Sequence, residues 1–175
     1  VKKGDEWVAE VITGTKTDQK LRGDFAKDQD TVKTVEDSVK ATKEKIDFIL
    51  SPKNADGFKG NFGGYNAKYG SQYLSGNTAA VKQKIESLKS EMKAAGLAIM
   101  RSGGGVGQIT EREWKIMENM IDSIDPLMDE KDAEAVLKEV AVKMDQAESR
   151  AKSKFNSEWG GSKYAKGSSG SWSDL

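Results

Sequence analysis

The sequence predicts an all-α protein, an elongated helical bundle of about four main helices with glycine-rich connections and a flexible C-terminal tail. Apolar residues recur at alternating spacings of three and four along long segments, the pattern of helices that each bury one stripe. Apolar residues make up 36% of the 175 residues and charged residues 32%, which suits thin, solvated helices around a narrow core. Prolines and most glycines fall between the stripes, where helices end.

Residues 1–23 are predicted to form an N-terminal arm, as a short helix or an extended segment, because they lack a long apolar stripe. The first main helix is predicted over residues 24–50. Its stripe consists of Phe25, Val32, Val35, Val39, Thr42, Ile46 and Ile49. Only Thr42 interrupts the apolar seam, and Ser51-Pro52 ends the helix because the residue before a proline disfavours helical backbone.

The second main helix is predicted over residues 77–100, antiparallel to the first, with residues 51–76 as the connection. Its stripe consists of Val81, Ile85, Leu88, Met92, Ala95 and Ile99. A glycine-rich turn is expected to end this helix, because so many glycines cost too much backbone entropy within a helix. The turn glycines are Gly103, Gly104, Gly105 and Gly107.

The last two helices, 110–124 and 129–155, are predicted to form a hairpin that Asp125-Pro126 interrupts. Thr110 and Glu113 have the spacing of a capping box, in which each side chain binds the other residue's backbone amide. Asp129 is the predicted N-cap of the last helix. The helical region thus spans residues 24–159, and residues 160–175 form a Gly/Ser-rich tail that is predicted to be flexible.

The composition argues against an enzyme. The chain has no His and no Cys, so it lacks the commonest general base and the thiolate nucleophile. The acidic residues between Asp125 and Asp132 do not have the spacing of an EF-hand, and the glycine turn lacks the Gly-Lys-Ser/Thr ending of a nucleotide-binding loop. The sequence therefore predicts no catalytic residue, no cofactor and no metal.

The charge distribution argues against sequence-specific nucleic-acid binding. The 28 basic and 28 acidic residues balance, residues 77–101 carry five bases and two acids, and residues 110–148 carry five bases and twelve acids. Without a strong basic stripe, only non-specific contact with DNA remains open. No window approaches the run of about 18 apolar residues that a membrane helix needs.

Aromatic residues recur at helical spacing in the connection between the first two main helices. They are Phe58, Phe62, Tyr65, Tyr69 and Tyr73. Such a stripe is usually core, but interleaved glycines weaken an isolated helix, so the segment is expected to form only when packed. Two interpretations follow: the aromatic face packs within its own bundle, or it contacts another subunit, a membrane or a pore wall.

Several segments resemble the C-terminal helical region of bacteriophage internal virion or DNA-transfer proteins, over roughly residues 40–165. The segments are 46–50 (IDFIL), 61–65 (NFGGY), 85–90 (IESLKS), 94–97 (AAGL), 107–114 (GQITEREW), 125–126 (DP) and 156–160 (NSEWG). The resemblance implies a virion component that oligomerises with itself and with other virion proteins. It also implies ejection with phage DNA and subsequent contact with the host membrane, and it supplies no catalytic residue.

The expected function is therefore that of a non-enzymatic virion structural protein, inside the capsid or in the portal and tail region, that assists genome delivery. After ejection it would reach the host cell envelope. The alternatives are another virion component, such as a head-to-tail connector, a tail protein or a scaffold, and a helical adaptor unrelated to virions.

Overall fold

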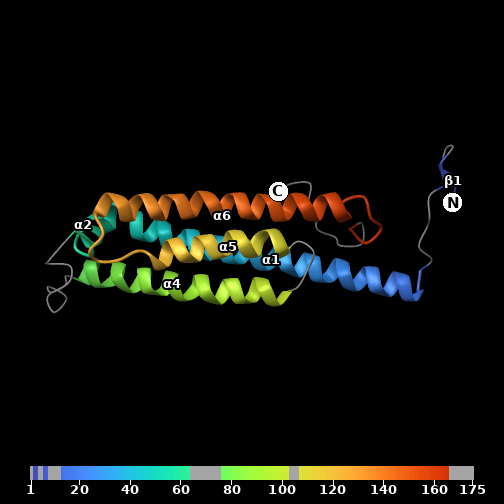
Figure 1. The fold of residues 1–175 in the computed structure, drawn as a ribbon, viewed down its shortest axis with the longest axis horizontal. Helices are drawn as coiled ribbons and strands as arrows, with labels where there is room; N and C mark the ends of the chain where they lie inside the picture. The colour runs from blue at the N-terminus through green and yellow to red at the C-terminus, as the bar shows by residue number, and fades with distance from the viewer. Residues whose placement is uncertain (1, 4–5, 8–12, 64–75, 103–106, 166–175) are drawn as a thin grey trace.

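The computed structural model describes residues 2–3, 6–7, 13–63, 76–102 and 107–165, and it confirms the predicted all-α fold (Figure 1). The elements in chain order are β1 (Lys2–Lys3), β2 (Glu6–Trp7), α1 (Lys16–Leu50), the 3-10 turn η1 (Pro52–Asn54), α2 (Ala55–Lys59), α4 (Gly76–Ser102), α5 (Gly107–Asp122) and α6 (Glu130–Trp159). The strands form only a two-residue antiparallel pair near the N-terminus. Four long helices dominate the fold.

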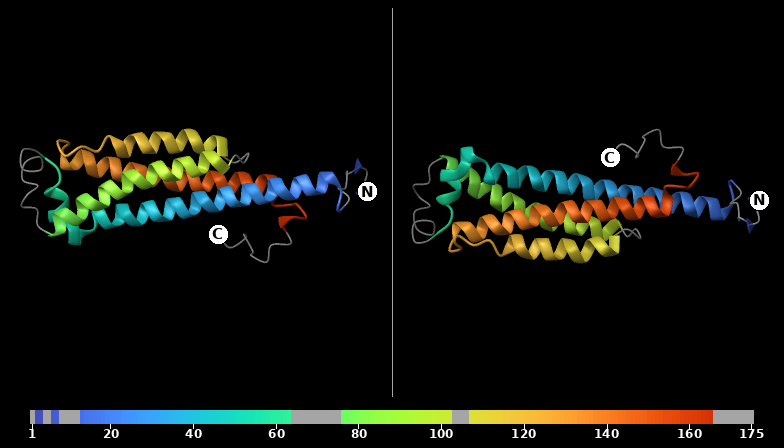
Figure 2. Two further views of the ribbon diagram at one scale, coloured as in Figure 1. Left: turned by 90° about the horizontal axis from the view of Figure 1, so that it is seen from below. Right: turned by 90° about the horizontal axis from the view of Figure 1, so that it is seen from above.

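The four long helices form an elongated bundle in which each helix has two neighbours. Helix α1 lies beside α4 and α6, and α5 lies beside the same two helices from the other side (Figures 1 and 2). At least one ion pair joins each neighbouring pair of helices, as in Lys45–Glu91, Lys93–Asp122, Arg150–Glu113 and Lys152–Glu36. The two predicted antiparallel hairpins, α1 with α4 and α5 with α6, are confirmed.

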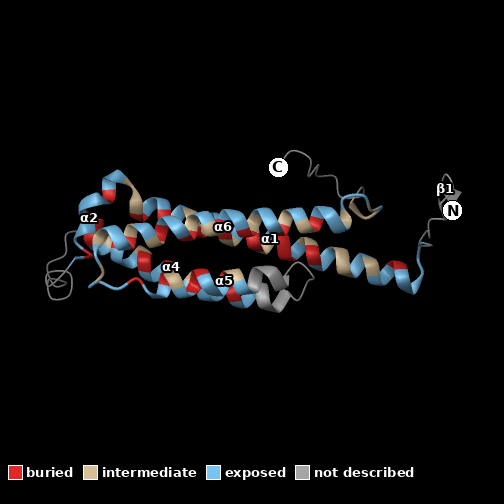
Figure 3. Cartoon of the chain, turned by 45° about the horizontal axis from the view of Figure 1, so that its top comes forward, coloured by how far each residue is buried: buried red, intermediate tan, exposed pale blue. Residues whose placement is uncertain are grey.

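The core is the narrow seam that the stripes predict (Figure 3). Its fully buried large side chains include Val32, Val35, Ile46, Ile49, Leu88, Met92, Trp114, Met117, Ile121, Leu137 and Met144. Asp129 is the N-cap of α6, as predicted, because its carboxylate accepts a hydrogen bond from the amide of Lys131 at 2.9 Å. Helix α6 continues to Trp159, four residues beyond the predicted end at residue 155.

The prediction for the start of the first helix is wrong, since α1 begins at Lys16 and not at residue 24. Thr15 is the N-cap, and its hydroxyl accepts a hydrogen bond from the amide of Asp18 at 3.2 Å. Helices α1 and α6 therefore extend beyond the end of the bundle at which α4 finishes and α5 starts (Figure 1). The molecule has a four-helix part and a two-helix extension, formed by the start of α1 and the end of α6.

The connection after α1 passes very close to the start of α4. A Cβ atom on Gly57 would lie 2.7 Å from the backbone oxygen of Asn77, so only glycine fits there. Nearby, the side-chain amide of Asn61 donates hydrogen bonds to the backbone oxygens of Gly57 at 2.8 Å and Thr78 at 2.9 Å. The buried Asn61 side chain therefore holds the segment that follows α2 against the first turn of α4.

Thr42, the polar residue in the predicted α1 stripe, allows a test of the core. Its side chain is fully buried, and its hydroxyl donates to the sulfur of Met92 at 3.8 Å, a weak acceptor. We expect Thr42→Val to raise the free energy of unfolding by about 0.5–1 kcal/mol, because the buried hydroxyl gains little from that contact. Urea unfolding followed by circular dichroism measures the change. Thr34→Val, at an exposed hydroxyl on the same helix, is the control, and a destabilised Thr42→Val protein would contradict the expectation.

Candidate functional site

Two carboxylates interrupt the seam of α1 in the two-helix extension. Asp18, Leu21, Phe25, Asp28 and Val32 follow one another at spacings of 3, 4, 3 and 4, so they continue the stripe of the four-helix part. Asp18 is 1% exposed and Asp28 is 6% exposed. Buried carboxylates need partners, and both find them near the end of α6.

Asp18 is held by a short segment that follows α6. Residues Gly160–Ala165, here called the clasp, fold back onto α1 on the side away from α4 and α5 (Figure 2). The Tyr164 hydroxyl donates to Asp18 at 2.8 Å, and the Lys163 ammonium lies 2.9 Å from the same carboxylate oxygen. The other oxygen accepts from the Gly14 amide and from Nε of Arg22, both at 3.0 Å. The clasp corrects part of the flexible-tail prediction, because it is packed, while residues 166–175 lie outside the described chain.

These donors set the protonation of the cluster. The Gly14 amide, then Lys163 and Tyr164, hold the pKa of Asp18 far below its usual range and outweigh the opposing effect of burial. Burial and the hydrogen bond to Asp18 raise the pKa of the Tyr164 phenol, and the same carboxylate raises the pKa of Lys163. A carboxylate that is stabilised in its ionised form is a poor general base. The cluster therefore suits attachment of one segment to another, not proton transfer.

The Asp18 cluster has a defined pH dependence. Because the pKa of Asp18 is lowered in the folded state, its stabilising effect is present above its ordinary pKa and disappears as the pH falls through the folded-state value. The effects of Tyr164 and Lys163, whose pKa values are raised, disappear in alkali instead. We expect Asp18→Asn to lower the denaturation midpoint clearly near neutral pH and much less in strong acid.

Guanidinium unfolding of the wild type and Asp18→Asn at several pH values measures this difference. The control is Asp145→Asn, which removes the partner of Lys43 in an ion pair whose aspartate side chain is 55% exposed, and which should change the midpoint little at any pH. A pH-independent difference between the wild type and Asp18→Asn would contradict the assignment.

An aromatic cluster lies next to Asp18 and packs α1 against α6 and the clasp in the two-helix extension. The ring of Phe25 lies 5.5 Å from that of Phe155, 5.4 Å from that of Trp159 and 6.4 Å from that of Tyr164, between centroids. The indole of Trp159 also donates to the Asp28 carboxylate at 2.9 Å. Asp18 and Asp28 thus each accept a hydrogen bond from one aromatic residue. The Asp28–Trp159 pair fixes the register of α1 against the end of α6, and the Asp18–Tyr164 pair fixes the position of the clasp.

The predicted aromatic contact segment divides between described and undescribed residues. Phe58 lies in α2 and Phe62 follows it, and both are buried in the core with ring centroids 4.9 Å apart. For these two residues the partner-contact hypothesis is wrong, because α2 and its continuation pack against their own bundle. Tyr65, Tyr69 and Tyr73 lie outside the described residues.

The predicted capping box is also wrong. Helix α5 begins at Gly107, so Gly107 is not part of a turn and Thr110 lies inside the helix, where it cannot be the N-cap. Glu113 forms an ion pair with Arg150 of α6 and so joins two helices. The other turn residues, Gly103, Gly104 and Gly105, lie outside the described chain.

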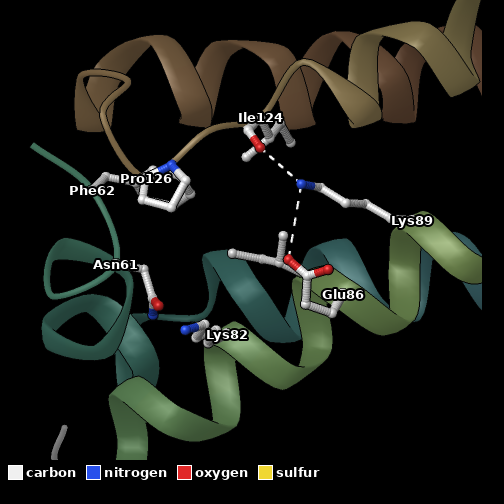
Figure 4. A pocket seen from close by; sticks show the side chains of 8 residues that line it. Asn61, Phe62, Lys82, Glu86, Lys89, Ile124 and Pro126 are labelled. Atoms are coloured by element: carbon white, nitrogen blue, oxygen red, sulfur yellow. Dashed lines mark hydrogen bonds and ion pairs between the residues drawn. The ribbon is translucent and has the colours of Figure 1, made fainter. Parts of the chain in front are cut away.

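A small pocket of about 40 Å³ lies where the connection, α4 and the α5–α6 turn meet (Figure 4). Asn61, Phe62 and Pro126 lie on one side, and Lys82, Glu86 and Lys89 project from α4. The ammonium of Lys89 donates to the backbone oxygen of Ile124 at 2.9 Å, so it satisfies a carbonyl just after the end of α5. The pocket has room for little more than water, and its charged side chains support the turn.

The remaining surface provides few candidates for chemistry. Within the described ranges, no group of three or more Asp or Glu side chains could hold a metal ion. In the same part of the chain, no helix has the length and apolarity that crossing a membrane requires. A groove of about 460 Å³ along α1 and α6 is lined by a mixture of acidic and basic residues, among them Glu36, Lys40 and Glu148.

The sequence contained one usable signal for the Asp18 cluster. The spacing of the stripe continues from Phe25 back through Leu21 to position 18. A carboxylate at that position indicates an exposed residue, so the sequence predicts that the buried stripe begins later. Its partner Tyr164 is 146 residues away, in a segment whose Gly and Ser content predicts flexibility. No protein-family model, curated protein or solved structure matches the chain.

Proposed function

We propose that the chain is a bacteriophage virion structural protein that acts by assembly and not by catalysis. The family resemblance supports an internal or ejection protein that oligomerises, contacts other virion proteins and assists genome delivery into the host. On this proposal the bundle is a rigid unit. Because α1 and α6 are longer than α4 and α5, the two-helix extension is the part that connects one copy to neighbouring proteins.

One observation carries the proposal: buried polar side chains in the described residues hold segments of the chain to one another. Asp18 holds the clasp, Asp28 holds Trp159, and Asn61 holds the backbone of α4. Such groups specify register and orientation, which an assembling unit needs.

Light scattering of the purified protein, with and without phospholipid vesicles, tests the proposal. We expect a reversible rise from monomer to a discrete multimer with concentration. Recruitment to vesicles that is lost when Tyr65, Tyr69 and Tyr73 are replaced by serine would support delivery to the host envelope. A multimer that ignores vesicles would favour a connector, tail or scaffold role, and a monomer under all conditions would favour the adaptor and contradict self-assembly.

A further inference from the structure

The charged and hydroxyl groups of the clasp bind α1, and its Tyr164 ring also lies 6.2 Å from the ring of Trp159 at the end of α6. The clasp contributes Lys163 and Tyr164, and the receptor consists of Asp18, Arg22 and Phe25. The guanidinium of Arg22 lies 5.9 Å from the centre of the Tyr164 ring, and the centre of the Phe25 ring lies 6.4 Å from the same point. An anion, a cation and an aromatic surface within two helical turns make a receptor that is specific for a Lys-Tyr pair.

The clasp is joined to α6 by two glycines that can act as a hinge. Gly160 keeps helical backbone angles, with φ −57° and ψ −29°, and its amide binds the Asn156 oxygen at 2.8 Å. Gly161 lies in open space, since a Cβ there would meet no atom within 4 Å. A change at Gly161 would swing Lys163 and Tyr164 away from α1 without disturbing the core.

We propose that the clasp of one copy binds the α1 receptor of a second copy, in place of its own. This inference rests on the proposed function, in which copies assemble. Exchange of an identical segment recreates the same hydrogen bonds and ring contacts, so the two forms differ mainly in hinge strain and in the effective concentration of the clasp. Reciprocal exchange would give a dimer, whereas donation from each copy to the next would give a ring or an open chain.

The ion pair itself provides the test, because the Lys163 nitrogen lies 2.9 Å from the Asp18 oxygen. A carbodiimide adds to the carboxyl group as an O-acylisourea, and the contacting amine then displaces the urea to form an amide bond, so this pair is suited to a zero-length cross-link. Wild-type protein grown with natural nitrogen is mixed with protein labelled with ¹⁵N, cross-linked, digested and analysed by mass spectrometry. Peptides that join Asp18 to Lys163 of one copy carry matched isotopes, and those that join two copies carry mixed isotopes.

We expect mixed-isotope Asp18–Lys163 peptides whose share rises with protein concentration. The Lys43–Asp145 pair, 2.6 Å apart between α1 and α6, is the matched control and should give matched isotopes only, because no hinge separates its helices. Asp18→Asn should abolish the first cross-link and leave the control unchanged. Matched isotopes alone at every concentration, or no Asp18–Lys163 product, would overturn the inference.

The mass of the same samples separates this inference from the proposed function. If the wild type forms a discrete multimer but gives only matched isotopes, assembly uses another surface, so the clasp inference fails while the proposed function stands. If the wild type is a monomer at all concentrations, the proposed function fails as well.

Discussion

Trp114→Ala is expected to lower the free energy of unfolding by about 3–5 kcal/mol, because it empties a fully buried position in the core. Trp114 is 1% exposed, and its indole nitrogen donates to the backbone oxygen of Met92 at 2.8 Å. The ring lies against Gly96, where a Cβ would come within 2.9 Å of it. Alanine would leave a cavity between α4 and α5 and remove the hydrogen bond that joins them.

Urea unfolding measured by circular dichroism gives the change in free energy. Ile116→Ala is the control: it removes an apolar side chain from the same helix, but one that is 44% exposed. We expect its effect to stay below about 1 kcal/mol. Equal effects of the two substitutions would contradict the packing of α5 against α4.

Gly57→Ala is expected to lower the free energy of unfolding by about 1–3 kcal/mol, although alanine favours helices. Gly57 lies in α2, so helix propensity alone would stabilise the alanine variant by about 1 kcal/mol. The new Cβ would lie 2.7 Å from the backbone oxygen of Asn77 and 2.9 Å from its carbonyl carbon. Because backbone atoms cannot rotate away as a side chain can, the steric cost outweighs the gain in propensity.

Gly23→Ala tests the propensity effect on its own. Gly23 lies in α1, and a Cβ there would meet no atom within 4 Å. We expect this variant to be more stable than the wild type by about 0.5–1 kcal/mol. Opposite signs for the two glycines, measured by thermal and urea unfolding, are the expected result. A stabilised Gly57→Ala variant would show that α2 does not lie close to α4.

The long helices could be predicted from the sequence because their stripes are apolar and regular. The seam through Val81, Ile85 and Leu88 of α4 repeats at helical spacing and needs no information from distant residues. The start of α1 could not be placed in this way. Asp18 and Asp28 occupy seam positions, but an aspartate is expected to be exposed unless it has a buried partner. Their partners, Tyr164 and Trp159, lie far away in the sequence.

The errors in the predicted site have a similar cause. Thr110 and Glu113 fit a local capping rule, but α5 begins three residues earlier and Glu113 pairs with Arg150 instead. The aromatic spacing is compatible with two alternative environments for Phe58, and tertiary packing places it in the core. Local patterns could identify these residues as structurally important, but only contacts between distant segments decide what each one binds.

The central claim, that copies of this chain assemble into a defined structural unit, is tested most directly by electron microscopy of the wild-type protein. The sample should be imaged at a concentration at which light scattering reports a multimer, or at the highest soluble concentration. We expect closed rings or tubes built from elongated helical bundles. Single elongated particles at every concentration would contradict the claim.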